Sequence, residues 1–247
     1  MGVTTGYLSE IFLSYQGEGL CAGRRHLFLR LSGCHLRCRY CDTPGSLERT
    51  STFRVDQNDG RRITGSNPLT PNEVLAHALR LLENGGGADG VAVTGGEPLL
   101  QADFLAELLT DARWPRPRLL ETSGTLPAKL SVVLATIDIV SMDIKLPSNT
   151  GEPPFWDEHA RFLAVAGEKA YVKILVDEST ALSELERAAH LVATEAPGAS
   201  VFLQPITDAD GAIDLTPSTA DRFFCTVRKH VSDLRVLPQF HKILSFQ

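Results

Sequence analysis

Short apolar runs alternate with longer segments of helical periodicity along the chain. The apolar runs predict strands over residues 26–31, 91–94, 118–121, 137–144, 170–176, 200–203 and 234–237. Apolar residues three and four positions apart predict helices over residues 70–85, 104–109, 158–166, 182–194 and 216–231. About six strand–helix units in succession favour a parallel sheet covered by helices. We therefore expect an α/β fold.

A helix start and one long polar segment can be recognised within this alternation. Thr70-Pro71-Asn72-Glu73 has the pattern of a helix capping box with proline at the first helical position. Residues 43–69 are long, polar and rich in glycine, arginine and asparagine, and segments of this kind are often lids or functional loops. Since no linker divides the chain, we expect one domain over residues 1–247 with a loop or lid insertion at about 43–69.

Polar motifs come directly after several predicted strands. They are Gly33-Cys34, Thr94-Gly95-Gly96-Glu97, Glu121-Thr122-Ser123-Gly124, Asp143-Ile144-Lys145 and Gln204-Pro205. In strand–helix barrels the functional sites lie at the carboxyl ends of the parallel strands. We therefore expect these motifs to meet in one site.

Three of the five cysteines lie within eight residues, with the spacing C-x3-C-x2-C at Cys34, Cys38 and Cys41. Iron–sulfur clusters are held by cysteine thiolates, and a cubane here would have one iron without a protein thiolate. The alternative is a zinc site, which needs a fourth ligand from His35, Cys21 or Cys225. If neither is a zinc ligand, we expect Cys21 and Cys225 to be core thiols.

Composition limits the classes of partner. The apolar fraction is 43% and the formal net charge is −6, so the chain is neither disordered nor broadly basic, and we expect no nucleic-acid partner. No run approaches the ~18 apolar residues of a membrane span, and the first residues do not form a secretory signal. We expect a cytoplasmic protein with no membrane partner.

The cysteine spacing resembles the signature of the radical S-adenosylmethionine superfamily. Tyr40 precedes the last cysteine, and Gly95-Gly96-Glu97-Pro98 is similar to the superfamily's second motif. The resemblance implies a four-iron four-sulfur cluster on Cys34, Cys38 and Cys41, with S-adenosylmethionine on the remaining iron. It also implies an incomplete (βα)6 TIM-like barrel, which agrees with the strand count.

Further motifs resemble one family within this superfamily, over nearly the whole chain. They are Tyr15-Gln16-Gly17-Glu18-Gly19, Arg30, Asp42-Thr43 and Leu237-Pro238-Gln239-Phe240-His241-Lys242. These motifs are similar to those of the 7-carboxy-7-deazaguanine synthases. The resemblance implies a radical carbon–nitrogen lyase that contracts the ring of 6-carboxy-5,6,7,8-tetrahydropterin to 7-carboxy-7-deazaguanine. Ammonia is released, and the product enters 7-deazapurine biosynthesis of the queuosine type.

The same resemblance implies roles for individual residues, with the radical carried by S-adenosylmethionine rather than by a catalytic side chain. Contacts to S-adenosylmethionine are implied for Tyr40, Gly95, Gly96, Glu97, Ser141, Met142, Asp143, Gln204, Pro205, Ile206 and Thr207. Contacts to substrate are implied for Tyr15, Gln16, Gly17, Arg30, Thr94, His241 and the terminal carboxylate of Gln247. Thr43 matches a hydroxyl that binds Mg2+ in the family. Met142 and Ser123 depart from the family pattern, in which proline and asparagine are common at these positions.

The resemblance also implies a small-molecule pterin substrate, a homodimer and an electron donor such as flavodoxin. Two other functions remain open at this point. A glycyl-radical-enzyme activating enzyme has the same cysteine spacing but a protein substrate. A non-catalytic zinc-binding domain needs only the metal site.

Overall fold

The sheet is the frame of the molecule. The computed structural model describes residues 3–57, 59–208 and 210–244. The strands are β1 (Leu8–Tyr15), β2 (Arg25–Leu31), β3 (Thr52–Asp56), β4 (Arg62–Ser66), β5 (Val91–Gly95), β6 (Arg118–Thr122), β7 (Ile139–Asp143), β8 (Ala170–Val176), β9 (Val201–Pro205) and β10 (Leu234–Val236). In the described residues they form one sheet in the order β10-β9-β8-β7-β6-β5-β2-β1-β3-β4.

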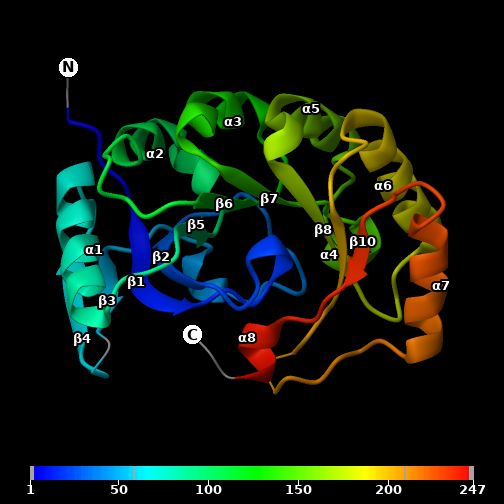
Figure 1. Cartoon of the computed structure of the whole chain (residues 1–247), viewed down its shortest axis with the longest axis horizontal. Coiled ribbons are helices and arrows are strands. Elements are labelled where there is room, and N and C mark those ends of the chain that lie inside the picture. Colours follow the sequence, from blue (N-terminus) through cyan, green and yellow to red (C-terminus); the bar gives the residue numbers. More distant parts are fainter. Residues whose placement is uncertain (1–2, 58, 209, 245–247) are drawn as a thin grey trace.

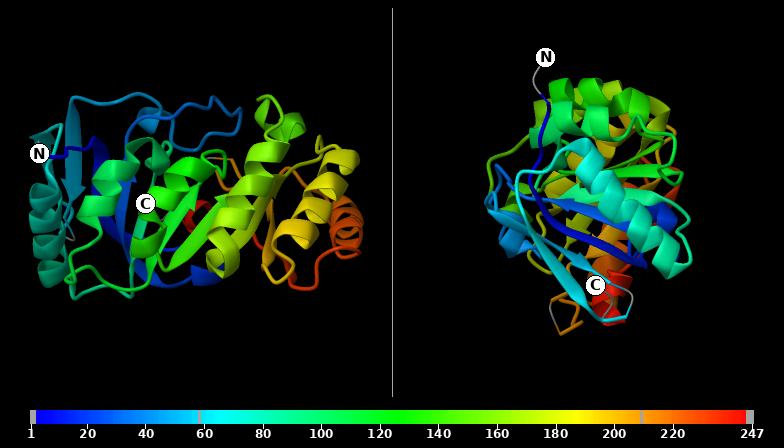
Figure 2. Two further views of the ribbon diagram at one scale, coloured as in Figure 1. Left: turned by 90° about the horizontal axis from the view of Figure 1, so that it is seen from above. Right: turned by 90° about the vertical axis from the view of Figure 1, so that its left-hand side faces the viewer.

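The strands from β2 to β10 along this order are parallel, and β1 is antiparallel to β2. Each crossover between parallel strands places a helix on the outer face of the sheet, so that the helices form an arc around it (Figure 1). Seen from above, these helices stand in a row along the sheet (Figure 2). The helices are α1 (Pro71–Gly85), α2 (Ala102–Leu108), α3 (Pro127–Val133), α4 (Pro147–Thr150), α5 (Trp156–Ala166), α6 (Leu182–Glu195), α7 (Pro217–Val227) and α8 (Phe240–Ile243). The arrangement confirms the expected α/β fold, an incomplete TIM-like barrel.

Most predicted elements are present with small differences at their ends. The strand expected over 137–144 is β7 alone, and the last long helix ends at Val227 rather than at 231. Sequence analysis did not predict β1, β3, β4, α3, α4 or α8. The segment 43–69 contains β3 and β4, which form a hairpin beside β1. That this segment is an insertion acting as a lid stays a prediction, as does the single-domain assignment.

Alternation along the strands separates two hydrophobic clusters. Leu27, Leu29 and Leu31 of β2 face the large cluster between sheet and helices. Phe28 lies on the inner face, in a smaller cluster with Phe12, Tyr171 and Phe202. Because side chains alternate between faces, Arg30 follows Phe28 on the inner face.

The two cysteines outside the cysteine motif differ in burial. Cys21 is buried in the inner cluster, as expected for a core thiol. Cys225 is exposed on α7, so its assignment to the core is wrong. Helical periodicity alone did not show that Cys225 points to solvent, because its neighbours Phe223 and Thr226 on the same helix are buried.

The predicted capping box at the start of α1 is present. The Thr70 hydroxyl accepts a hydrogen bond from the Glu73 amide, and the Glu73 carboxylate accepts one from the Thr70 amide at 2.8 Å. Replacing Thr70 with alanine should lower the free energy of unfolding by about 1 kcal/mol, because one amide at the helix start loses its partner. Urea denaturation measures this, and Thr70→Ser should keep most of the stability. An unchanged midpoint for Thr70→Ala would contradict the role of the cap.

Among the described residues, no helix is both long enough and apolar enough to cross a membrane.

Candidate active site

A cavity of about 990 Å³ opens at the carboxyl ends of the parallel strands. It is lined by most of the residues for which a site role is predicted: Tyr15, Gln16, Gly17, Arg30, Cys34, Cys38, Tyr40, Cys41, Thr43, Thr94, Gly95, Gly96, Asp143, Gln204, Ile206, Thr207 and His241. The lining does not include Glu97, Ser141, Met142 or Pro205. Gln247 lies outside the described residues. The structure therefore brings the strand-end motifs to one place, whereas the ligand contacts of the individual residues stay predictions.

The cysteine loop follows β2 directly. Its three cysteines are partly buried and line the cavity. Burial raises the pKa of the Cys34 and Cys38 thiols, so these groups lose their protons most readily when a metal compensates the charge. The loop is fixed at its far end by the Arg39 amide, which donates to the Thr150 carbonyl at 3.0 Å.

The spacing of the sulfurs bears on the kind of metal centre. Among the described residues, the one group of three potential metal ligands whose donor atoms all lie within 4.8 Å of one another is Glu18, Asp42 and His241, so the three cysteine sulfurs are not all within that distance of one another. Two thiolates on one tetrahedral zinc would be only about 3.8 Å apart. The three candidates for a fourth zinc ligand, His35, Cys21 and Cys225, do not line the cavity. The site therefore fits an iron–sulfur cluster better than structural zinc.

The turn after β5 (residues 95–98) packs on the start of the cysteine loop. The Gly96 amide donates to the Leu31 carbonyl at 3.1 Å, and the Glu97 amide donates to the Gly33 carbonyl at 2.9 Å. A Cβ atom at Gly96 would lie 2.3 Å from the Gly33 carbonyl oxygen. Glycine at this position is therefore required by the approach of two backbones, and it holds the turn against the cysteine loop.

Glu97 lies behind the cavity wall and is 1% exposed. Its carboxylate accepts hydrogen bonds from the Leu99 amide at 3.0 Å, the Thr122 hydroxyl at 2.8 Å, and the Ser123 amide and hydroxyl at 2.9 and 2.6 Å. These bonds tie the turn to the end of β6. A direct contact between Glu97 and a ligand stays a prediction, because the structure accounts for this carboxylate by contacts within the chain.

A second carboxylate, Glu121, faces the cavity from β6. It accepts hydrogen bonds from the Thr94 hydroxyl at 3.0 Å and from the Gln16 side-chain amide at 3.1 Å. Sequence analysis placed Glu121 at a strand end but gave it no substrate contact. Its position beside Gln16 and Thr94 adds an acceptor to the residues predicted to bind substrate.

Arg30 enters the cavity from β2. Its guanidinium donates to Glu10 Oε2 at 3.0 Å and to the Thr43 hydroxyl at 3.2 Å, and it lies 5.3 Å from the centre of the Phe12 ring. The Thr43 hydroxyl donates to Asp42 Oδ1 at 2.9 Å. A guanidinium cation therefore lies beside two oxygen atoms that could be metal ligands, as required to bind an anionic group together with Mg2+.

Four buried charges alternate in sign along another wall of the cavity. Lys145 Nζ lies 2.9 Å from Asp143 Oδ2, Lys173 Nζ lies 3.4 Å from Asp143 Oδ1, and Lys173 also pairs with Glu18. Burial alone would lower the pKa of both lysines, but the carboxylates raise it well above its usual value. Burial alone would likewise raise the pKa of Glu18, but Lys173, His241 and Gln239 lower it to about 2. Lys145, Lys173 and Glu18 therefore carry charge at neutral pH. Of the four, sequence analysis assigned a role only to Asp143.

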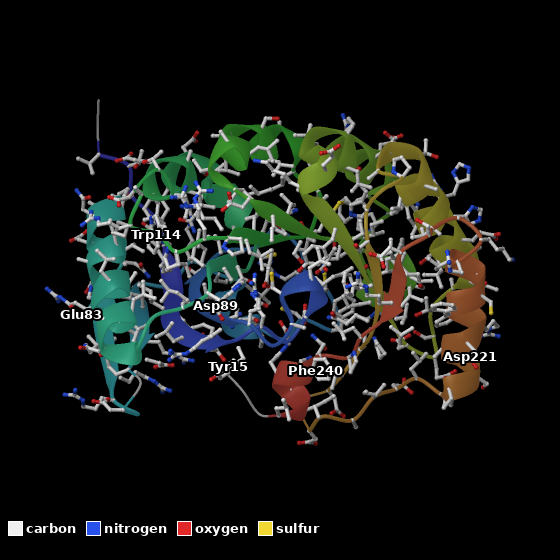
Figure 3. All side chains as sticks on the ribbon, viewed as in Figure 1. Tyr15, Glu83, Asp89, Trp114, Asp221 and Phe240 are labelled. Atoms are coloured by element: carbon white, nitrogen blue, oxygen red, sulfur yellow. The ribbon has the colours of Figure 1, made fainter. Side chains whose placement is uncertain are left out.

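Residues from the end of the described chain border the cavity, among them Gln239 and His241. The Gln239 side chain donates to Glu18 Oε1 at 2.8 Å, and the Phe240 amide donates to the Gly17 carbonyl at 3.1 Å. Figure 3 shows Tyr15 and Phe240 on the same side of the molecule, at the bottom of the view. A Cβ atom at Gly17 would lie 2.3 Å from His241 Nδ1, so only glycine allows this approach.

Comparisons with known proteins agree with this geometry. Residues 29–177 match the model of the Radical SAM superfamily. A 7-carboxy-7-deazaguanine synthase of Geobacter sulfurreducens is 36% identical over 241 residues, which cover 96% of each chain. A protein of the same name from Methanopyrus kandleri is 34% identical, covering 96% of this chain and 92% of its own. The crystal structure of QueE from Escherichia coli has a TM-score of 0.60 and 21% identity and covers 95% and 94% of the two chains, which supports the fold.

The superfamily match spans the cysteine loop and the turn after β5, and the chain is a radical S-adenosylmethionine enzyme. Similarity to the curated relatives extends over nearly the whole chain, beyond the residues that the superfamily model covers. The chain belongs to the 7-carboxy-7-deazaguanine synthase family. Membership implies the iron–sulfur cluster and S-adenosylmethionine as cofactors.

Proposed function

We propose that the chain converts 6-carboxy-5,6,7,8-tetrahydropterin into 7-carboxy-7-deazaguanine with release of ammonia. The observation that carries the proposal is that the cysteine loop lines the same cavity as Arg30, Gln16, Thr94 and Glu121. The cavity therefore offers sulfur ligands together with a cation and amide, hydroxyl and carboxylate groups. A carboxylated pterin has complementary groups: an anion and a ring edge rich in hydrogen-bond donors and acceptors.

The chain's own residues bind and orient the reactants. Arg30 pairs with the substrate carboxylate, because a guanidinium can donate two parallel hydrogen bonds to it. Glu121, oriented by Gln16 and Thr94, accepts hydrogen bonds from the N–H groups of the pterin edge. Mg2+ binds at the Thr43 hydroxyl beside Asp42, where oxygen donors suit it.

Another wall of the cavity holds the cofactors. Cys34, Cys38 and Cys41 bind the cluster, and Tyr40 borders the adenine of S-adenosylmethionine. Gly95, Gly96, Asp143, Gln204, Ile206 and Thr207 line the adjoining space. Both amide atoms of Gln204 are buried without a hydrogen-bond partner within the described residues, which favours a ligand contact there. Glu97, Ser141, Met142 and Pro205 support this wall from behind. When bound, the cluster and S-adenosylmethionine supply the hydrogen-abstracting radical chemistry of the superfamily.

The remaining roles depend on residues that border the site. Tyr15, Gly17 and His241 border the substrate space, and the contacts of Gln239 with Glu18 and of Phe240 with Gly17 hold the segment after β10 against one side of it. A cavity narrowed on this side favours a small substrate over the protein substrate of a glycyl-radical-enzyme activating enzyme. We further propose a cytoplasmic homodimer that receives electrons from a low-potential carrier such as flavodoxin.

The test is anaerobic reconstitution with iron and sulfide, followed by incubation with the carboxylated tetrahydropterin, S-adenosylmethionine and Mg2+. Mass spectrometry should detect 7-carboxy-7-deazaguanine and ammonia release. Zinc without iron after anaerobic purification would instead favour the binding domain, and a loaded cluster without product would overturn the proposed substrate.

Replacing Arg30 with methionine should lower kcat/KM for the pterin by about 10- to 100-fold, mainly through KM, because charge-assisted hydrogen bonds contribute about 1.5–3 kcal/mol. Steady-state kinetics and the iron content of each protein check this. Arg54 is the matched control, because it pairs with the same Glu10 carboxylate but does not line the cavity. If Arg54→Met lowered kcat/KM as much as Arg30→Met does, the effect would come from Glu10 rather than from substrate binding.

A further inference from the structure

The four alternating charges form one continuous arrangement, here called the charge ladder: Lys145, Asp143, Lys173 and Glu18. Its side chains are between 6% and 17% exposed. Each inner member pairs with two neighbours of opposite sign, since Asp143 contacts both lysines and Lys173 contacts both carboxylates. The ladder is neutral as a whole, but its two ends carry opposite charges.

The cationic end of the ladder faces the cysteine loop. Lys145 Nζ lies 5.4 Å from the centre of the Tyr40 ring, and Tyr40 stands between Cys38 and Cys41 in the chain. Lys145 and all three cysteines line the same cavity. The anionic end, Glu18, accepts a hydrogen bond from Gln239, and its carboxylate lies within 4.8 Å of that of Asp42, the residue after Cys41.

We propose that the positive charge of Lys145 raises the reduction potential of the cluster bound by Cys34, Cys38 and Cys41. In this role Lys145 is a positioning residue and not a catalytic one. The inference rests on the proposed function only in requiring that cluster. Reduction adds one electron, taken from a low-potential carrier, and makes the cluster one unit more negative; no bond changes and no proton moves. A buried cation nearby stabilises the more negative state, because charges interact strongly where water is excluded.

The surrounding charges define what Lys145 does. Glu97, Glu152 and Asp143 act on the cysteines with negative charge. Burial raises the pKa of Cys34 and Cys38, and the Lys145 ammonium opposes that rise at both residues. Asp143 fixes Lys145 in place and partly offsets its charge, while Lys173 holds Asp143 on its other side. Lys145 and Asp143 should therefore shift the potential in opposite directions.

The experiment is an anaerobic potentiometric titration of the reconstituted holoenzyme, followed by electron paramagnetic resonance without substrate. Lys145→Met should make one-electron reduction about tenfold less favourable, a midpoint lower by about 59 mV. Lys145→Arg should stay within about threefold of the parent, because the charge is kept. Asp143→Asn should move the midpoint upwards. Lys229→Met, in the exposed turn after α7, is the matched control and should leave it unchanged.

An unchanged midpoint in Lys145→Met, or a lower one in Asp143→Asn, would overturn the inference. If Lys145→Met does not take up iron, the sign of the Asp143→Asn shift and the midpoint of Lys145→Arg decide. Product formation by the parent protein separates the two proposals. If the parent protein makes product but the midpoint of Lys145→Met is unchanged, only the present inference fails. If the midpoint of Lys145→Met falls as expected but the parent protein makes no product, only the proposed substrate fails.

Discussion

Replacing Cys38 with alanine should give a folded protein that holds no four-iron cluster and forms no product. The reason is that the three partly buried cysteines of the loop are the sulfur donors that line the cavity. With one thiolate removed, two ligands remain for a cluster that needs at least three. Iron and sulfide analysis, visible absorption and product mass spectrometry measure the loss.

The control for this variant is Cys225→Ala, because Cys225 is exposed on α7 and does not line the cavity. It should bind the same amount of iron as the parent and turn over substrate at the same rate. Circular dichroism checks that both variants are folded. Product formed by Cys38→Ala would exclude that thiolate as a cluster ligand.

Replacing Lys173 with methionine should cost about 3–5 kcal/mol of the free energy of unfolding at pH 7, because removing one partner leaves buried charges uncompensated. Lys173 is 6% exposed and pairs with both Glu18 and Asp143. Urea denaturation measures the loss. The double variant Glu18→Gln/Lys173→Met should recover part of it, since Asp143 still has Lys145 and Glu18 no longer carries charge.

The same variant should show a definite dependence on pH. The pKa of Glu18 in the folded protein is about 2, below the usual value of 4.5 for a glutamate side chain. Its carboxylate therefore contributes stability that is complete above about pH 4.5 and is lost as the pH falls towards 2. The difference between the parent and Lys173→Met should shrink over that range. If Lys173→Met lost no more free energy of unfolding at pH 7 than Lys229→Met, the charge ladder would have no role in stability.

The predictable part of the fold is the part with a local apolar pattern. Residues 170–176 are all buried, and they form β8 over the predicted range. The strand β4, in contrast, has four exposed residues of five and carries no apolar signal, because it exists through backbone pairing with β3. The strand β1 was also missed, since two partly buried polar residues interrupt its apolar positions.

The predictable part of the site is the part that follows strand ends in sequence. The motifs at residues 33–41, 94–97 and 143–145 meet because parallel strands bring their carboxyl ends together. The pair between Lys173 and Glu18 joins residues 155 positions apart, and no local pattern encodes such a contact. Lys173 thus looks like an isolated cation in an apolar strand until the fold supplies its partners.

The contact between Gln239 and Glu18 joins residues 221 positions apart, which has a consequence for biosynthesis. On the ribosome the cysteine loop emerges early, whereas the segment with Gln239 that borders the cavity is among the later parts of the chain to be made. A nascent chain therefore exposes its thiols to solvent through most of translation and can complete the lining of its cavity only once residues 239–241 have emerged. Iron loading before that moment would leave an oxygen-sensitive centre unprotected, so cluster insertion after release is the safer order of assembly.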